Sequence, residues 1–353
     1  MINGRRTIMS KSYKLKNLNV INTIFLIGSP IIALLGVLLW LKVDGFTWQI
    51  PALAVIFYFA TGIGITAGYH RLIAHRAYKS NSFYKAIMLI LGGSALQNSA
   101  LKWCNDHRVH HGKVDTEHDP YNINEGFFYA HMGWILLQED IEDYRYSKDL
   151  LNDKLVMLQH KYYMPMIVFF SFILPGIIGH LWVDSFLGGF FVAGFARAVI
   201  VHHCTFFINS LCHMMGTRPY DSEQTARDSW VMALFTFGEG YHNYHHTFQS
   251  DYRNGIKWYH YDPTKWLIWS AEKIGITSNL RRTKEVDIIA KMIETNLSDI
   301  QNKNTSATIA ELSTQILEKA REIVARIKDS GNHATAEFNE LLILLKQSRA
   351  LIS

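Results

Sequence analysis

The stretch from residue 238 to residue 246 reads Gly-Glu-Gly-Tyr-His-Asn-Tyr-His-His, and the rest of the chain can be interpreted outward from it. His242, His245 and His246 are spaced i, i+3 and i+4, so on a helix their imidazoles lie on one face. Neutral imidazoles that converge on one point are common ligands of transition metals. The stretch therefore predicts a helix that carries a metal site.

Two further groups of histidines repeat this chemistry. Residues 106–111 read Asp-His-Arg-Val-His-His, which has the same His-x-x-His-His spacing, and residues 70–75 read His-Arg-Leu-Ile-Ala-His. Because zinc takes four ligands and iron up to six, so many imidazoles indicate two metal ions. The eight histidines of the three boxes are His70, His75, His107, His110, His111, His242, His245 and His246.

The histidines outside the boxes are expected to be core or surface residues. The adjacent pair His202–His203 belongs with them, since neighbouring side chains diverge on a helix. The same expectation covers His118, His131, His160, His180, His260 and His333.

Carboxylates beside the boxes are expected to orient the imidazole rings. Metal-bound histidines usually donate their other ring N–H to a carboxylate or a carbonyl. Soluble di-iron proteins use paired Glu-x-x-His motifs, and Glu239 with His242 is the one match here, so a carboxylate-rich centre is not supported. Some of the following side chains should contact the rings and others should be solvated: Asp106, Asp115, Glu117, Asp119 and Glu239.

The composition indicates membrane spans combined with a sizeable water-exposed part. Apolar residues make up 49% of the 353 residues, and the mean hydropathy is +0.02. The net charge of +5 comes without a basic stripe, so it does not indicate nucleic-acid binding and suits an anionic membrane surface. Three cysteines without Cys-x-x-Cys spacing indicate neither a disulfide framework nor a thiolate site.

The fold class expected is an all-α membrane protein with two transmembrane hairpins and a cytosolic helical domain that holds the di-metal site. Four apolar runs are long enough to cross a bilayer, at about 20–41, 48–69, 162–183 and 186–204. The run at 83–96 is interpreted as buried or interfacial, since a further crossing would separate the first box from the second. Arg197, inside the fourth span, should face protein rather than lipid. Basic residues before the first span place the N-terminus in the cytoplasm, with cytosolic segments at 70–160 and 205–283.

The C-terminal part is expected to be a non-catalytic helical tail, 284–353, that follows a catalytic domain, 1–283. A polar linker is predicted at 298–308. An amphipathic helix then ends near Gly331, a plausible C-cap, and a second helix follows it to form a hairpin. The apolar positions expected to pack are Leu312, Ile316, Ala320, Ile323, Ile327, Phe338, Leu341, Leu342 and Leu345.

The ordered motifs resemble those of the membrane fatty acyl-CoA desaturases of the stearoyl-CoA delta-9 type. The resemblance covers about residues 15–285. It rests on His-Arg-x-x-x-His, on Asp-His-Arg-x-His-His with the Asp-Thr-x-x-Asp-Pro-Tyr-Asn that follows, and on the stretch 238–246. It implies two iron ions bound by nine histidines, the ninth being His213, and a metal-bound water held by Asn209. It also implies that Gln97 and Trp103 lie at the bend of an acyl tunnel and that Asn98 and Asp106 lie near the CoA head group. Asn105 stands where the vertebrate pattern has arginine.

The reaction implied is the oxidation of an unactivated methylene pair to a cis alkene. O2, two electrons, two protons and the two hydrogens removed from the acyl chain together give two waters. A methylene has no acidic proton, so the chemistry needs a metal or cofactor rather than a side-chain base. Electrons would come from a separate ferredoxin or b-type cytochrome. The acyl-CoA head group is expected beside basic residues at the cytosolic face, namely Arg71, Arg76, Lys79, Lys102 and Lys113.

Three alternatives stay open. A membrane hydroxylase with similar histidine boxes would release an alcohol, and an acyl-lipid desaturase would differ in the carrier of the acyl chain. A divalent-metal transporter is the alternative that is not an enzyme, although transporters place their ligands near mid-membrane, whereas these boxes lie outside the predicted spans. The membrane would be a bacterial inner membrane or the endoplasmic reticulum.

Overall fold

The structure is a computed structural model that describes residues 18–137, 143–301, 307–330 and 335–351. The chain forms two compact units. Unit 1 contains the residues up to Ile65 together with Ala86–Leu211, and unit 2 contains Thr66–Lys85 together with Cys212–Ser353. The basic N-terminal residues used to predict the orientation, as well as Gly331 and His333, lie outside the described residues.

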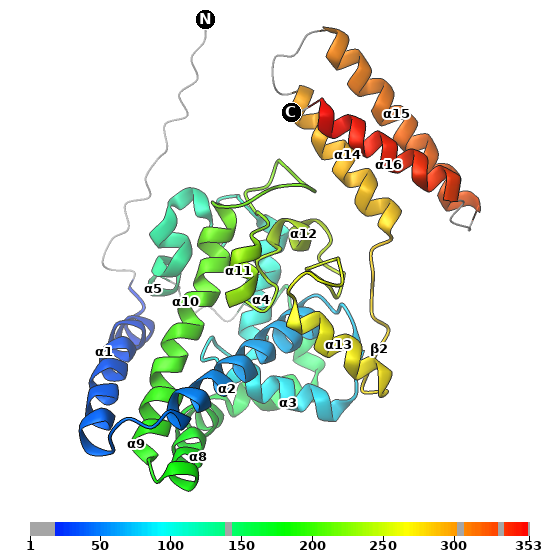
Figure 1. Cartoon of the computed structure of the whole chain (residues 1–353). Coiled ribbons are helices and arrows are strands. Elements are labelled where there is room, and N and C mark those ends of the chain that lie inside the picture. Colours follow the sequence, from blue (N-terminus) through cyan, green and yellow to red (C-terminus); the bar gives the residue numbers. More distant parts are fainter. Residues whose placement is uncertain (1–17, 138–142, 302–306, 331–334, 352–353) are drawn as a thin grey trace, which may run out of the picture. The chain divides into compact units, whose positions relative to one another are not determined.

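Among the described residues, four helices are long and apolar enough to span a membrane, in agreement with the four predicted runs. They cover Val20–Val43, Gln49–Ala74, Tyr163–Val183 and Phe186–His213, so the chain is an integral membrane protein. The first is α1 (Val20–Val43) (Figure 1). The others contain α-helical and π-helical parts, and the last ends in a 3-10 helix. They are α2 (Gln49–Ile63) with η2 (Gly64–Ala74); α7 (Tyr163–Val168), η6 (Phe169–Ile173) and α8 (Leu174–Val183); and α9 (Phe186–Gly188), η7 (Gly189–Ala196), α10 (Arg197–Ser210) and the 3-10 helix η8 (Leu211–His213).

Two tight turns make these helices into the predicted hairpins. The turn after α1 contains Asp44, and the turn between α8 and α9 contains Asp184, at a φ of 56°, and Ser185. The Ser185 hydroxyl donates a hydrogen bond to a carboxylate oxygen of Asp44 at 2.5 Å. Both turns of unit 1 therefore lie at the same end of their helices.

The apolar run at 83–96 forms helix α3 (Ser82–Gly93), which has 12 residues. At about 1.5 Å per residue such a helix is about 18 Å long, well short of the roughly 30 Å hydrocarbon core of a bilayer. It is not among the four candidate spans, so the prediction that this run does not cross is confirmed. Arg197 is buried, with 1% of its surface exposed, which confirms that it faces protein.

The second box lies on α4 (Ala100–Lys113), a regular helix of 14 residues in unit 1. Ser99 caps its N-terminus, because the side chain accepts from the backbone N–H of Lys102. Short helices follow: η3 (Ile123–Glu125), η4 (Tyr129–Gly133), α5 (Trp134–Leu136), η5 (Leu150–Asn152) and α6 (Lys154–Lys161).

Unit 2 carries the first and third boxes and is also mainly helical. One small departure from the all-α prediction is an antiparallel pair of two-residue strands, β1 (Lys79–Ser80) and β2 (Thr277–Ser278). The helices after the spans are α11 (Trp230–Phe235), α12 (His242–Thr247), α13 (Pro263–Lys273), α14 (Glu285–Gln301), α15 (Ala307–Ser330) and α16 (Thr335–Ala350).

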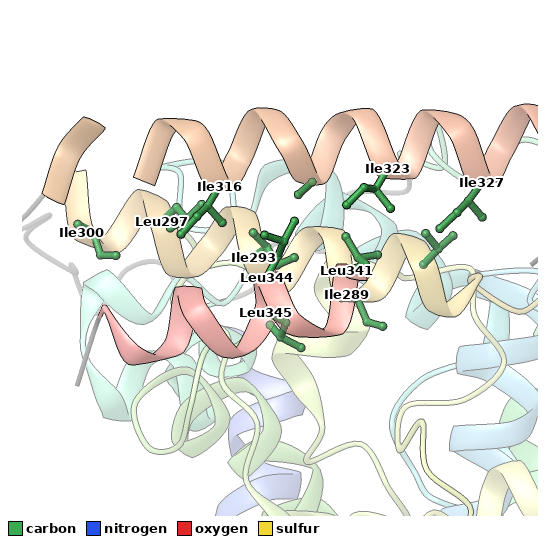
Figure 2. Close-up of a cluster of buried hydrophobic side chains, with 12 residues drawn as sticks. Ile289, Ile293, Leu297, Ile300, Ile316, Ile323, Ile327, Leu341, Leu344 and Leu345 are labelled. Carbon is green, nitrogen blue, oxygen red and sulfur yellow. The ribbon is translucent and has the colours of Figure 1, made fainter. Parts of the chain in front are cut away.

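The described part of the tail contains three helices, α14, α15 and α16, rather than the predicted two (Figure 1). Helix α14 reaches Gln301 and α15 begins at Ala307, so every residue of the predicted linker at 298–308 is helical or lies outside the described residues. A shared core joins α14, α15 and α16 (Figure 2). Ile316, Ala320, Ile323, Ile327, Leu341 and Leu345 are buried in it as expected, together with Ile293 and Leu297 of α14. Leu312 is wrong as a core prediction, since 43% of its surface is exposed.

Candidate metal centre

The first box lies on a π-helical continuation of the second span. Successive side chains of an α-helix are about 100° apart, so two residues separated by five would point about 140° apart. Directly after η2 the backbone N–H of His75 instead bonds to the carbonyl of His70 at 3.0 Å, which continues the i to i+5 pattern of a π-helix. The wider turn brings His70 and His75 together on one side, with their ring centroids 4.7 Å apart.

One group of imidazoles in unit 2 contains His70, His75 and His245. The ring of His245 lies 4.4 Å from that of His70 and 4.7 Å from that of His75, measured between centroids. The Nε2 atoms of His70 and His245 face each other at 3.0 Å. One ring nitrogen from each of the three residues lies within 4.8 Å of the others, which is close enough to share a metal ion.

A second group in unit 2 contains His213, His242 and His246, all of them buried. The Nε2 atom of His242 lies 3.1 Å from that of His213 and 3.1 Å from that of His246. On the opposite edge of the His213 ring, Nδ1 is hydrogen-bonded to the hydroxyl of Thr225 at 2.7 Å. Spacing gave no reason to select His213, which entered the expected set through the family resemblance alone.

The box on α12 therefore divides between two groups, and the prediction that its three imidazoles converge on one point is wrong. His242 and His246 lie 4.4 Å apart between ring centroids, whereas His245 lies 5.9 Å and 5.8 Å from them. Since i+3 and i+4 lie on either side of residue i on a helix, His245 and His246 point about 100° apart. One box can in this way supply ligands to two ions.

The box on α4 in unit 1 divides in the same way. His107 and His111 lie 4.6 Å apart between ring centroids, while His110 lies 6.3 Å and 5.5 Å from them. The ring of His110 stacks on Tyr121 at 4.3 Å. The identical spacing of the two boxes thus has an identical geometric result.

Two of the carboxylates that were expected to orient the rings do contact box histidines. An oxygen of Glu239 lies 2.9 Å from Nδ1 of His70, and an oxygen of Asp119 lies 2.8 Å from Nδ1 of His110. An ionised carboxylate only accepts, so Nδ1 of each ring carries the proton and Nε2 presents a lone pair. This tautomer is the one that a metal ion requires, and the donor set fits two transition-metal ions. Glu117, by contrast, is exposed.

Glu239 is held in turn by a buried charge network. The guanidinium of Arg71 donates to Glu239 Oε1 at 2.9 Å and to Asp262 Oδ2 at 3.0 Å, and Asn254 donates to Glu239 Oε2 at 2.6 Å. Burial alone would raise the pKa of Glu239, but its interaction with His70 and the charge and hydrogen bonds of Arg71 outweigh burial and lower this pKa. Only 1% of the Arg71 surface is exposed, so the expectation that Arg71 meets the acyl-CoA head group is wrong.

The two glycines around Glu239 are required by the backbone. Gly238 has a φ of +99°, and a Cβ there would lie 2.6 Å from the Asp262 side chain. A Cβ on Gly240 would lie 2.2 Å from the backbone nitrogen of Ala233. The Gly-Glu-Gly sequence therefore brings the carboxylate close to its partners by a path that side chains would block.

Helix α12 has six residues and is stabilised mainly by distant contacts. The side-chain carbonyl of Asn243 accepts from the Tyr220 N–H at 2.9 Å, and its amide donates to the carbonyls of Asp221 and Ala226 at 2.8 and 2.9 Å. The Tyr244 hydroxyl donates to Asp251 at 2.8 Å. The sequence analysis assigned no role to Asn243, because an asparagine between two histidines gives no signal of the loop that it holds.

Two of the residues that the resemblance places along an acyl tunnel, Gln97 and Trp103, contact each other. In unit 1 the Gln97 amide donates to the Thr205 hydroxyl at 2.9 Å and accepts from the Trp103 ring N–H at 3.4 Å. Asn98 follows with a φ of +76°, and Asp106 is half-buried on α4. Asn209 is half-buried near the end of α10. Asn105 is buried and donates to the Asp143 carbonyl at 3.0 Å, so it is engaged within the protein.

Several other histidines have structural contacts, as expected. Nε2 of His131 is hydrogen-bonded to Nδ1 of His203 at 3.0 Å, and Nδ1 of His131 to Ser210 at 3.1 Å. Burial and the neighbouring His203 lower the pKa of His131 to about 4. The three cysteines are free thiols, in agreement with the sequence.

Comparison with known proteins identifies the family. The family described as "Fatty acid desaturase" matches residues 46–275, which include all three boxes and His213. The chain belongs to this family. It is 42% identical to the "Probable acyl-CoA desaturase" of Schizosaccharomyces pombe over 280 residues. These residues make up 77% of this chain and 57% of that protein.

Other relatives agree with this family. The "Acyl-CoA desaturase 1" of Saccharomyces cerevisiae is 37% identical over 310 residues, which is 85% of this chain and 59% of the yeast protein. The human "Stearoyl-CoA desaturase" is 35% identical over 269 residues, 74% of each chain. The match thus spans less than two thirds of the length of the two fungal relatives and about three quarters of the human one.

Proposed function

We propose that this chain is a fatty acyl-CoA desaturase that introduces a cis double bond at the delta-9 position of a saturated acyl chain. The observation that carries this proposal is the pair of imidazole groups in unit 2. Within each group, Nε2 atoms of different rings lie 3.0–3.1 Å apart. Such imidazole-rich sets fit two iron ions, and the names of the relatives supply the reaction and the acyl-CoA substrate.

The proposed ligands are the nine histidines His70, His75, His107, His110, His111, His213, His242, His245 and His246. His70, His75 and His245 contribute to one ion, and His213, His242 and His246 contribute to the other, while α4 supplies the remaining three. Glu239, Asp119 and Thr225 hold the outer nitrogens of His70, His110 and His213, which fixes the direction of each ring. Asn209 is proposed to hold a metal-bound water. Iron would supply the oxygen-dependent removal of hydrogen from methylene groups that side chains cannot deprotonate.

The rest of the machinery positions the acyl chain and excludes water. Gln97 and Trp103 would contact the chain at its bend, and Asn98 and Asp106 would lie near the head group. Regiochemistry then depends on how far the chain extends before the bend, which is a positioning effect. A separate ferredoxin or b-type cytochrome would deliver the electrons. The N-terminus and the active site would face the cytoplasm, with residues 1–283 as the catalytic domain and 284–353 as a tail outside the chemistry.

Expression in a host that lacks unsaturated fatty acids tests this proposal. We expect gas chromatography of the host lipids to show a new monounsaturated acid, and His110→Ala and His245→Ala to abolish it. His180→Ala is a matched control, because His180 is exposed and pairs with Asp184 at the turn between α8 and α9. Product formation that survives in both box variants would remove the histidine centre from the mechanism.

Product chemistry separates the remaining possibilities. An alcohol in place of an alkene would show a hydroxylase and contradict the proposal. Purified protein with its electron donor should convert stearoyl-CoA but not a stearoyl phospholipid. The reverse preference would show an acyl-lipid desaturase.

A further inference from the structure

The segment that links α3 to α4 carries Gln97 in a strained turn. Leu96 and Asn98, on either side of Gln97, have φ angles of +61° and +76°. Residues other than glycine rarely adopt this region, and leucine does so less readily than asparagine, so the surroundings must hold Leu96 in place. Leu96 is buried against Ile167 and Ala198.

Arg197 supports this turn from α10. Its guanidinium donates to the Ser94 carbonyl at 2.8 Å and to the Ser171 carbonyl at 3.2 Å, and its Nε donates to the Ala193 carbonyl at 3.1 Å. Among the described residues, no carboxylate lies within ion-pair distance of it. A cation buried inside a span without an acidic partner is costly, so backbone carbonyls must replace its hydration.

His202 supports the next two residues of the turn. Its Nε2 lies 2.9 Å from the Ala95 carbonyl oxygen and 3.2 Å from that of Leu96. Carbonyls only accept, so Nε2 carries the proton and donates to both. Only 4% of the His202 surface is exposed, which leaves little room for water to replace the ring.

Thr205 is the third residue of α10 that binds the turn, because its hydroxyl accepts a hydrogen bond from the Gln97 side-chain amide at 2.9 Å. Arg197, His202 and Thr205 are spaced i, i+5 and i+8 along α10. Three side chains from successive turns of one helix thus bind the consecutive residues Ser94, Ala95, Leu96 and Gln97. The contacts follow the order of the chain, so α10 fixes the backbone of the turn and the direction of its glutamine together.

We infer that Arg197 and His202 are positioning residues that hold the turn 94–98 and thereby determine which carbons of the acyl chain are oxidised. This inference rests on the proposed function, in which Gln97 contacts the chain at its bend. If the turn relaxes, Gln97 and the Trp103 that donates to it move, and the chain bends at a different depth. The expected result is a change in the position of the double bond, and not merely a slower reaction.

The test compares His202→Leu, which removes the donor, with His202→Gln, whose amide can still donate, and with His203→Leu. His203 is the matched control, because it is the next residue on the same helix and bonds to His131 rather than to the turn. The product measurement is the ratio of double-bond positional isomers formed from stearoyl-CoA, determined by mass spectrometry of derivatised esters. We expect His202→Leu to change this ratio about fivefold, which corresponds to about 1 kcal/mol, and His202→Gln to restore most of it. Arg197→Gln should change the ratio in the same direction.

A second measurement reports on the turn without any turnover. Hydrogen exchange of the 94–98 amides should be faster in His202→Leu than in the wild type and in His203→Leu. Unchanged exchange, or slower turnover with an unchanged isomer ratio, would overturn the inference and leave His202 a merely structural residue. Absence of any alkene from the wild-type protein would instead contradict the proposed function, while the exchange result would still decide whether His202 holds the turn 94–98.

Discussion

The two boxes with His-x-x-His-His spacing, on α4 and on α12, reach the same geometry by different routes. Helix α4 is a regular helix of 14 residues, capped by Ser99, and Asp119 lies nine residues after the His110 that it orients. Helix α12 has six residues and relies on the side chain of Asn243, which is hydrogen-bonded to the backbone of Tyr220 and Asp221, 23 and 22 residues earlier in the chain. Local structure therefore fixes one box and tertiary contacts fix the other, so the box on α12 should be the more sensitive to remote substitutions.

The largest effect is expected from removing the side chain that ties α12 to its loop. Asn243→Ala would remove the hydrogen bonds to four backbone groups, two of them buried and two partly buried. At about 1 kcal/mol for each buried bond and less for the others, about 3 kcal/mol of stability should be lost. Ser99→Ala, the corresponding support of α4, removes one cap and should cost about 1 kcal/mol. Thermal unfolding of the two detergent-solubilised variants measures the difference. Equal losses would contradict the contrast between the two boxes.

A smaller effect is expected from the tail. Ile288 of α14 is buried against Tyr220 and Tyr244, and the hydroxyl of Thr295 donates to the Tyr220 carbonyl at 2.8 Å. Ile288→Ala should cost about 2 kcal/mol or slightly more, because it leaves a cavity beside the tyrosine that stands between His242 and His245. Ile323→Ala is a matched control, because Ile323 is buried in the core that α14, α15 and α16 share. Metal release to a chelator should accelerate in Ile288→Ala and not in Ile323→Ala. Equal release rates would show that α14 does not support the third box.

The smallest effect is a pH dependence in the contacts of α12. Burial raises the pKa of Asp228 to about 7, and its carboxylate accepts from the Tyr244 N–H at 3.0 Å. Because this pKa lies above the value in the unfolded chain, the folded state binds the extra proton, and the associated stability is lost as pH rises from about 4 through about 7. The melting temperature of the wild type should fall over this range relative to Asp228→Asn, which cannot titrate. Parallel profiles for the two proteins would contradict the effect.

The sequence predicted features that depend on local pattern. Apolar length located the four spans, and the shortness of α3 agrees with the argument from box topology. Repeated spacing selected the three histidines on α4 and the three on α12, and each set of three divides as helix geometry requires. The His-x4-His pair added His70 and His75. Helix α14 also carries a local pattern, because Ile289, Ile293, Leu297 and Ile300 lie at helical spacing and are buried in the tail's core.

Other features depend on contacts that no local pattern encodes. The π-helical form of residues 64–74 arises in a segment whose composition also suits an α-helix, and it alone brings His70 beside His75. His213 is a lone histidine, and its partners come from residues 225, 242 and 246. Arg71 was expected at the surface because arginine usually lies there, whereas Glu239 and Asp262 hold it in the interior.

The most direct test of the account is the number of metal ions bound per chain, measured by mass spectrometry of the purified, iron-reconstituted protein. We expect two ions in the wild type, a loss from one site in His245→Ala and from the other in His242→Ala, and no loss in the His180→Ala control. A wild-type content well below two, or a content that neither box variant lowers, would contradict the claim that these imidazoles form a di-metal centre.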